Sequence, residues 1–193
     1  MIIRKAVPAD AHQIAGLIIL AMDDLAAKFA GESDPFKAIP LFEHFAALPG
    51  NQYSYENILV YEEEGVVSGM ISAYDGADLE TLRAPFLTYL QTTYGFDSIP
   101  EAETEAGEYY IDCVSVAQGK QGRGIGKKLI VALIEKVIPA KHHTVGLLVS
   151  LNNPQAEKLY GRLGFKTVSR RHFMGGDYSH MQYGLSGDTS SDS

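Results

Sequence analysis

The sequence has a single cysteine, Cys113, among its 193 residues. One thiol excludes an intrachain disulfide framework and the usual cysteine-rich zinc modules. No apolar run approaches the roughly 20 residues that a membrane-spanning helix needs. The opening residues, MIIRKAVPAD, lack the apolar stretch and the small-residue cleavage site of a signal peptide. We therefore expect a cytoplasmic protein with no membrane partner.

Basic residues are scarce in the first half of the chain. Residues 1–106 contain 17 Asp and Glu against 5 Lys and Arg, whereas residues 107–193 contain 7 against 11. The net charge of −8 and the lack of a basic arm argue against nucleic-acid binding. This division can draw an anionic ligand to the second half and a cationic one to the first. Ordinary solvated surface would give the same counts.

The length and the 46% hydrophobic content suit one domain with a proper core. We place it at residues 1–186 and expect the polar tail, 187–193, to be disordered. The patterns predict strands at 1–8, 58–61, 66–74, 108–116 and 145–151 and a hairpin at 165–185. They predict a helix from Asp10, as its cap, to about 30, a helix at 125–138 that Pro139 ends, and a helix at 154–163 with Asn153 as its cap.

Two stretches are less regular. Glu62–Glu64 read as an exposed acidic turn. Residues 75–107 resemble an insertion, with helical spacing of Leu82, Phe86, Leu87 and Leu90 followed by an acidic loop. This segment either lies over a binding site or is a packed surface helix.

Residues 118–128, QGKQGRGIGKK, form a glycine-rich run between a predicted strand and a predicted helix. This arrangement aims free backbone N–H groups at an anion. A Walker nucleotide site fails because Gln121 and Lys128 replace the required Gly and Ser or Thr. A dinucleotide site fails because Lys127 stands where the third glycine belongs and the run lies late in the chain.

The remaining pattern is [Q/R]-x-x-G-x-[G/A], which Gln121 to Gly126 satisfy. With this motif the chain resembles the GNAT superfamily of acyl-CoA N-acyltransferases. The flanks agree, since Val116 precedes the run and Asn153, Ala156 and an LY…GF phrase follow in the family's order. Gln118 departs from the family, which commonly has Pro there. The likeness covers about residues 1–185.

The resemblance implies an α/β fold with a mixed, mostly antiparallel sheet, flanked by helices and splayed near Val116 between its two central strands. It also implies acetyl transfer from acetyl-CoA to a primary amine by direct attack, without a metal. The implied cofactor-binding residues are Val114, Ser115 and Val116 through their main chain, Gln121, Gly122, Arg123, Gly124, Ile125, Gly126 and Lys127 at the phosphates, and Asn153, Ala156 and Tyr160. Lys128 is a further basic candidate.

Tyr160 holds the position at which the family places a general acid, since a protonated phenol can donate to a departing thiolate. The amine must lose a proton, because at pH 7 only about 1 alkyl ammonium in 2,500 is neutral. Two-residue alternation places Asp112 on the strand face of Val114 and Val116, as a candidate base acting through a water. A structural carboxylate is equally compatible, and Glu108 and Tyr110 are reserves.

The histidines are weaker candidates. His142-His143 are expected in a turn, and His172 and His180 lie on opposite arms of the last hairpin, where they could pair. Cys113 is expected to point away from Asp112 and to pack as a small apolar residue.

The resemblance leaves the acceptor open between a small metabolite, an antibiotic, a polyamine, a peptide and a protein lysine. A homodimer is also open. A non-catalytic module that senses acyl-CoA would keep residues 121–126 but would need neither Tyr160 nor Asp112.

Overall fold

The computed structural model describes residues 1–22, 24–137 and 144–184. Three expectations lie outside the described residues: the helix end at Pro139, the turn at His142-His143 and the tail at 187–193. Seven strands form one sheet in the order β1-β2-β3-β4-β5-β7-β6. All neighbours are antiparallel except β4 and β5. The strands are β1 (Ile2–Lys5), β2 (Ile58–Glu63), β3 (Val66–Asp75), β4 (Tyr109–Val116), β5 (Thr144–Ser150), β6 (Lys166–Phe173) and β7 (Gly176–Gly184).

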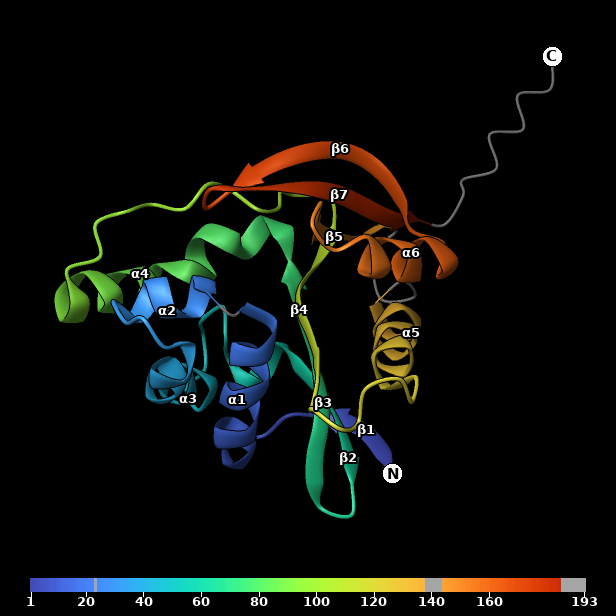
Figure 1. Ribbon diagram of the computed structural model, residues 1–193, viewed down its shortest axis with the longest axis horizontal. Coiled ribbons are helices and arrows are strands. Elements are labelled where there is room, and N and C mark those ends of the chain that lie inside the picture. The colour runs from blue at the N-terminus through green and yellow to red at the C-terminus, as the bar shows by residue number, and fades with distance from the viewer. Residues whose placement is uncertain (23, 138–143, 185–193) are drawn as a thin grey trace.

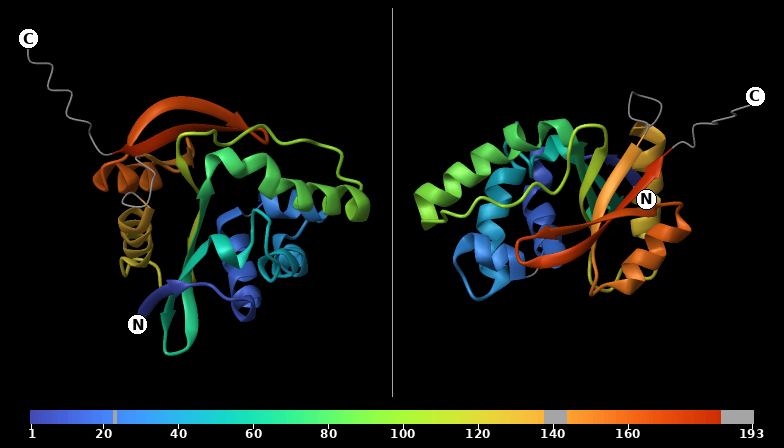
Figure 2. Two further views of the ribbon diagram at one scale, coloured as in Figure 1. Left: turned by 180° about the vertical axis from the view of Figure 1, so that it is seen from behind. Right: turned by 90° about the horizontal axis from the view of Figure 1, so that it is seen from above.

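Helices cover both faces of the sheet (Figures 1 and 2). One face carries α1 (Ala11–Met22), α2 (Asp24–Ala30), α3 (Ile39–Ala46) and α4 (Leu79–Tyr94). The other carries α5 (Ile125–Val137) and α6 (Pro154–Arg162). Short 3-10 turns lie at Pro8–Asp10, Pro35–Ala38, Tyr55–Asn57 and Gly76–Asp78.

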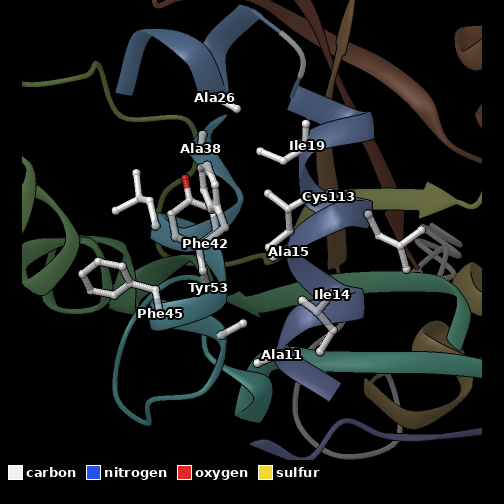
Figure 3. Close-up of a cluster of buried hydrophobic side chains, with 14 of the residues drawn as sticks. Ala11, Ile14, Ala15, Ile19, Ala26, Ala38, Phe42, Phe45, Tyr53 and Cys113 are labelled. Atoms are coloured by element: carbon white, nitrogen blue, oxygen red, sulfur yellow. The ribbon is translucent and has the colours of Figure 1, made fainter. Parts of the chain in front are cut away.

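Each face has its own apolar core. On the α1 side, Ile14 and Ile18 of α1 pack with Phe42 of α3 and Phe86 of α4, and Figure 3 shows part of this cluster. On the α5 side, the core residues include Leu129, Ile130, Ile71 and Leu147. The apolar faces of α1 and α5 therefore pack into two different cores on opposite sides of one sheet.

Three local expectations need correction. The helix expected from Asp10 to about residue 30 is two helices, α1 and α2. The Asp10 carboxylate caps no amide of α1, but accepts from the Val7 N–H at 2.9 Å and pairs with Arg4 at 2.7 Å. Glu62–Glu64 are not simply an exposed turn, because two of them belong to β2 and form ion pairs.

The two central strands separate early. β4 and β5 pair only from Tyr109 opposite Val145 to Ile111 opposite Leu147. The expected splay is confirmed, but it begins after Ile111 and not near Val116. From Asp112 onward, β4 is paired with β3 alone within the described part of the sheet.

A β-bulge lies at the point where the strands separate. Ser72 pairs with Cys113 and Ala73 with Ile111, so Asp112 is an extra residue on β4. Ile111 and Val114 both pack in the α5-side core, while Cys113 packs in the α1-side core. The bulge shifts the alternation of side chains by one residue, so the residues after Asp112 face the side opposite to the one that simple alternation predicts. The prediction that Asp112 shares a face with Val114 is therefore wrong, as is the prediction that Cys113 points away from Asp112.

Gly146 of β5 provides a first test of this arrangement. A Cβ at Gly146 would overlap the carboxylate of Glu108, which lies against the glycine backbone just before the strands separate. Gly146→Ala should lower the free energy of unfolding by about 1–3 kcal/mol, as overpacking does. Urea denaturation measures this value.

The matched control is Gly16→Ala in α1, where a Cβ meets nothing within 4 Å. It should stabilise the protein by about 0.5–1 kcal/mol, because alanine is the better helix former. Equal effects of the two substitutions would contradict the packing described for Gly146.

Candidate active site

The glycine-rich run forms the loop between β4 and α5. Gly122 and Gly124 both have φ of 76°, which only glycine adopts without strain. None of the backbone N–H groups of residues 121–127 has a hydrogen-bond acceptor among the described residues. They lie at the N-terminus of α5, where the helix dipole also favours an anion. Gly126 lies against Val114 and Val116, so this loop adjoins the separated part of β4.

The basic side chains of the loop have different partners. Arg123 and Lys120 both bind Glu63 of β2, each at 3.0 Å. Lys128 lies over the ring of Tyr61, 5.6 Å from its centroid. Lys127 is exposed and has no ion-pair partner among the described residues. The Gln121 side chain donates to the Val116 carbonyl at 3.3 Å, which ties the loop to the end of β4.

A cavity of about 310 Å³ lies where β4 and β5 separate. Its wall on the β5 and α6 side includes Val149, Asn153, Ala156 and Tyr160. The opposite wall comes from α1, α2 and α4 and is mostly apolar. Asp112, Cys113 and Val114 of β4 lie between the two walls. The cavity thus joins five of the predicted site residues, namely Asp112, Val114, Asn153, Ala156 and Tyr160.

Tyr160 reaches the cavity from α6. The Asn153 side chain caps this helix by accepting from the Ala156 N–H at 3.1 Å. The Tyr160 ring packs edge-to-face on Phe165, with the centroids 5.7 Å apart. Its hydroxyl has no hydrogen-bond partner among the described residues. Burial, with a smaller effect of Cys113, raises the pKa of Tyr160 to about 12, so the phenol keeps its proton at neutral pH.

Asp112 belongs to a pair of carboxylates. The Gln52 amide donates to Glu103 Oε1 at 2.7 Å and to Asp112 Oδ1 at 3.4 Å. The Tyr74 hydroxyl also donates to Glu103 Oε1, at 3.1 Å. Asp112 Oδ2 and Glu103 Oε2 have no donor within the described part of the chain. One amide therefore bridges two acids, each with a free oxygen.

Burial is the main influence on the protonation of this pair. It raises the pKa of Glu103 to about 7, against the opposing effects of Tyr74, Gln52 and Arg83. Burial, and then the nearby charge of Glu103, raise the pKa of Asp112 well above its ordinary value. Two acids this close in an apolar site resist double ionisation. Glu103 therefore gains or loses its proton near pH 7, beside an Asp112 carboxyl whose pKa is also raised.

The reserve candidates take different places. Tyr110 lines the cavity, whereas Glu108 is buried beneath it and bonds to His180 Nε2 at 2.8 Å. Burial works to raise the pKa of Glu108, but hydrogen bonds from His180, Thr104 and Gln182 outweigh it, and the pKa lies below its ordinary value. The predicted pairing of His172 with His180 is wrong, because His172 bonds to Asp177 at 2.9 Å.

Comparison with known proteins agrees with this geometry. The model of the acetyltransferase (GNAT) family matches residues 19–165. The chain belongs to the GNAT acetyltransferase family. This confirms the family resemblance that the sequence indicated. The predicted fold class is confirmed as well.

Individual relatives are similar to different degrees. An acetyltransferase crystal structure is 33% identical, with a TM-score of 0.80 over 95% of this chain and 99% of that one. An N-acetyltransferase from Staphylococcus aureus Mu50 is 25% identical, with a TM-score of 0.81 over 95% of this chain and all of that one. The structure of yncA from Salmonella typhimurium with its cofactor acetyl-CoA is 21% identical, with a TM-score of 0.58 over 100% of this chain and 98% of that one, and this likeness shows the fold alone.

A curated relative matches only in part. The mycothiol acetyltransferase of Gordonia bronchialis is 34% identical over 97 residues, which are 50% of this chain. The matched region spans about a quarter of that relative, 27% of its length.

The cavity residues of this GNAT protein that sequence analysis did not identify include Gln52, Tyr53, Arg83 and Glu103. Glu103 stands among several glutamates of one acidic loop, and no local pattern distinguishes it. Helical spacing in α4 identified Phe86 as an apolar position, and Arg83 lies one turn before it. Of these four residues, Arg83 is therefore the one that a sequence pattern could have identified.

Among the described residues of this GNAT protein, no helix is long and apolar enough to cross a membrane. Nor do they contain a group of three or more His, Cys, Asp or Glu side chains placed to hold a metal ion.

The Glu103 carboxyl predicts a pH-dependent stability of this GNAT protein. Its pKa rises from 4.5 to about 7 on folding, so between these values the folded state binds more protons than the unfolded state. The free energy of unfolding should therefore fall as pH rises through this window. Glu103→Gln removes this penalty and should stabilise the protein at pH 8 by about 1–3 kcal/mol, with little effect at pH 4.5.

Denaturant unfolding at the two pH values measures the difference. Glu105→Gln is the control, because Glu105 lies in the same loop but is exposed, paired with Arg171 at 3.0 Å. A stability gain for Glu103→Gln that is equal at both pH values would contradict the raised pKa.

Proposed function

We propose that this GNAT protein is an N-acetyltransferase that moves the acetyl group of acetyl-CoA to a primary amine by direct attack. The observation that carries the proposal is the cavity in which the Tyr160 hydroxyl and the Asp112 carboxylate both lie, next to the loop amides of residues 121–127. Neither the Tyr160 hydroxyl nor these amides have a hydrogen-bond partner among the residues that the structure describes. These are the groups that the reaction requires: an anion site, a proton acceptor and a proton donor.

The donor site would use the backbone. The amides of residues 121–127 would bind the pyrophosphate of coenzyme A, and Lys127 would add a positive charge. The unpaired edge of β4, from Val114 to Val116, would bond the amide-bearing arm, which then enters between β4 and β5. Acetyl-CoA supplies the activated acetyl group in this position. Asn153 and Ala156 would line its path at the start of α6.

The protein's own groups would then move the protons. Asp112 would accept a proton from the ammonium, so that the nitrogen lone pair can attack. Tyr160 would donate its proton to the departing sulfur, and its raised pKa keeps that proton available at neutral pH. Overall, an ammonium and a thioester give an amide, a thiol and one proton released to solvent.

A non-catalytic acyl-CoA sensor is the competing function. It would explain the free amides of the loop, but it requires neither the open Tyr160 hydroxyl nor a carboxylate in the same cavity. Thiol release from acetyl-CoA in the presence of primary amines tests the proposal. Binding of acetyl-CoA with no amine-dependent thiol release would favour the sensor.

Tyr160→Phe tests the proton donor. Turnover should fall by about 10²–10⁴-fold, the usual contribution of general acid catalysis. The dissociation constant of acetyl-CoA should stay within about twofold, because only a hydroxyl is removed. Tyr183→Phe is the control, since Tyr183 packs near Phe165 but does not line the cavity. Wild-type turnover in Tyr160→Phe would assign the proton donor elsewhere.

Gly124→Ala tests the anion site. A Cβ at φ of 76° strains the loop by roughly 1–2 kcal/mol and displaces the amides that follow. Acetyl-CoA should bind about tenfold more weakly by calorimetry. Gly50→Ala, at φ of 69° in a distant turn, carries similar strain and should leave affinity unchanged. An equal loss in both variants would show that the effect is general instability.

A further inference from the structure

The chemistry of the acceptor can be inferred from the charges inside the cavity. Among the described residues that line it, only Arg83, Glu103 and Asp112 carry charge. Tyrosines and Cys113 surround the two acids, and burial raises the pKa of each one, so that they are neutral near pH 7: Tyr53, Tyr74, Tyr110, Tyr178 and Cys113. The cavity thus offers one anionic position and one cation.

The anionic position suits a single ammonium. Glu103 is only 6% exposed, yet its Oε2 has no donor among the described residues, and the same holds for Asp112 Oδ2. Among the described residues, the fully buried side-chain polar atoms without a partner are Ser72 Oγ and Arg83 Nε, so these two carboxylate oxygens keep accessible surface that a ligand can reach. The Gln52 amide donates to Glu103 Oε1 and to Asp112 Oδ1 and so fixes these two oxygens. Glu103 Oε2 and Asp112 Oδ2 are left for a donor that the described residues do not supply. A primary ammonium has three N–H donors, enough for both.

The rest of this wall is apolar. Met22, Leu25 and Phe29 of α1 and α2 face the cavity together with Phe86 and Leu87 of α4. A second ammonium would be buried against these side chains without a partner. Arg83, the remaining charged side chain among the described residues of the cavity, is 7% exposed and would repel it. Its guanidinium is held by Glu80 at 2.6 Å and by the Pro100 carbonyl at 3.2 Å.

The size of the cavity restricts the acceptor further. Its volume of about 310 Å³ is near the lower end of the roughly 300–1,000 Å³ of small-molecule pockets, and the acetyl group must share it. Glu103 comes from the segment between α4 and β4, which runs beside the β6–β7 hairpin (Figure 1). Arg171 and the Met174 N–H hold this segment through Glu105 and Glu101, each at 3.0 Å. The Glu103 carboxylate is therefore a fixed part of the wall.

Resting on the proposed N-acetyltransferase function, we propose that the acceptor is a small primary amine with one ammonium group and an apolar body, and that Glu103 and Asp112 together bind this ammonium and take its proton. In this step one N–H bond breaks, one carboxyl O–H bond forms, and the nitrogen keeps the electron pair. The second N–H proton, lost after attack, balances the one that Tyr160 gives to sulfur. The carboxyl proton leaves to solvent.

Calorimetry with four probes tests the binding part of this proposal without requiring turnover. These probes are 2-phenylethylamine, its neutral analogue 2-phenylethanol, spermidine and glucosamine. 2-Phenylethylamine should bind most tightly. Glu103→Gln and Asp112→Asn should each weaken it by about tenfold or more, as expected for loss of a charge-assisted hydrogen bond. Glu135→Gln, at an exposed position of α5 that does not line the cavity, should leave its affinity unchanged.

Tighter binding of spermidine or glucosamine, or equal binding of 2-phenylethanol, would overturn the acceptor class. If the probe that binds most tightly also supports thiol release from acetyl-CoA, the proposed function still stands. Selective binding of 2-phenylethylamine with no thiol release from acetyl-CoA would support the acceptor class and count against N-acetyl transfer. No binding of any probe would overturn the acceptor class. Thiol release from acetyl-CoA with other amines would then test the proposed function separately.

The pH profile of kcat/KM separates a catalytic Glu103 from a structural one. The charge of Glu103 raises the pKa of Asp112, so Glu103→Gln should move the acid limb of the profile to lower pH. Thermal unfolding confirms that the variant is folded under the assay conditions. An acid limb at the wild-type position in folded Glu103→Gln would overturn the shared proton site.

Discussion

The separation of β4 from β5 after three residue pairs is the constraint on which the site depends. Parallel pairing that continued to Val116 would satisfy the β4 backbone and fill the space now occupied by the cavity. The buried Glu108 carboxylate, bonded to His180 and Gln182 of β7, lies against Gly146 at the last paired positions. This contact therefore holds the two strands together close to the point where they separate. It fixes one end of the opening between β4 and β5.

The bulge at Asp112 uses the same position. An extra residue in β4 turns Asp112 toward Gln52 and Glu103, while Val114 and Val116 still face α5. One irregularity thus places a carboxylate on the acceptor side and leaves the donor side lined by valines and glycines. Charge follows the same division, because the loop before α5 offers amides and Lys127, whereas the α1 side offers two acids. The acidic first half and basic second half of the sequence correspond to these two sides only in part, because Asp112 lies in the second half and Glu63 of the first half pairs with Lys120 and Arg123 at the loop.

Much of this arrangement could be predicted from the sequence because its signals are local. The glycine run, the Asn153 cap and the apolar periodicity of α5 each depend on neighbours within a few residues. The family resemblance then supplied the fold and the place of Tyr160. The errors have a different origin. The sequence of β4 carries no signal for the bulge, so simple alternation gave Asp112 the wrong face. The Gln52 and Glu103 contacts join residues 51 positions apart, and no spacing rule could pair them.

We propose that the separated strands and the glycine loop form one binding site for acetyl-CoA. Hydrogen–deuterium exchange of backbone amides, measured by NMR with and without acetyl-CoA, tests this proposal. Amides with no partner exchange readily, so we expect residues 121–127 to gain protection on binding, together with β4 beyond Asp112. Unchanged exchange in both segments, with acetyl-CoA bound, would show that the cofactor binds elsewhere.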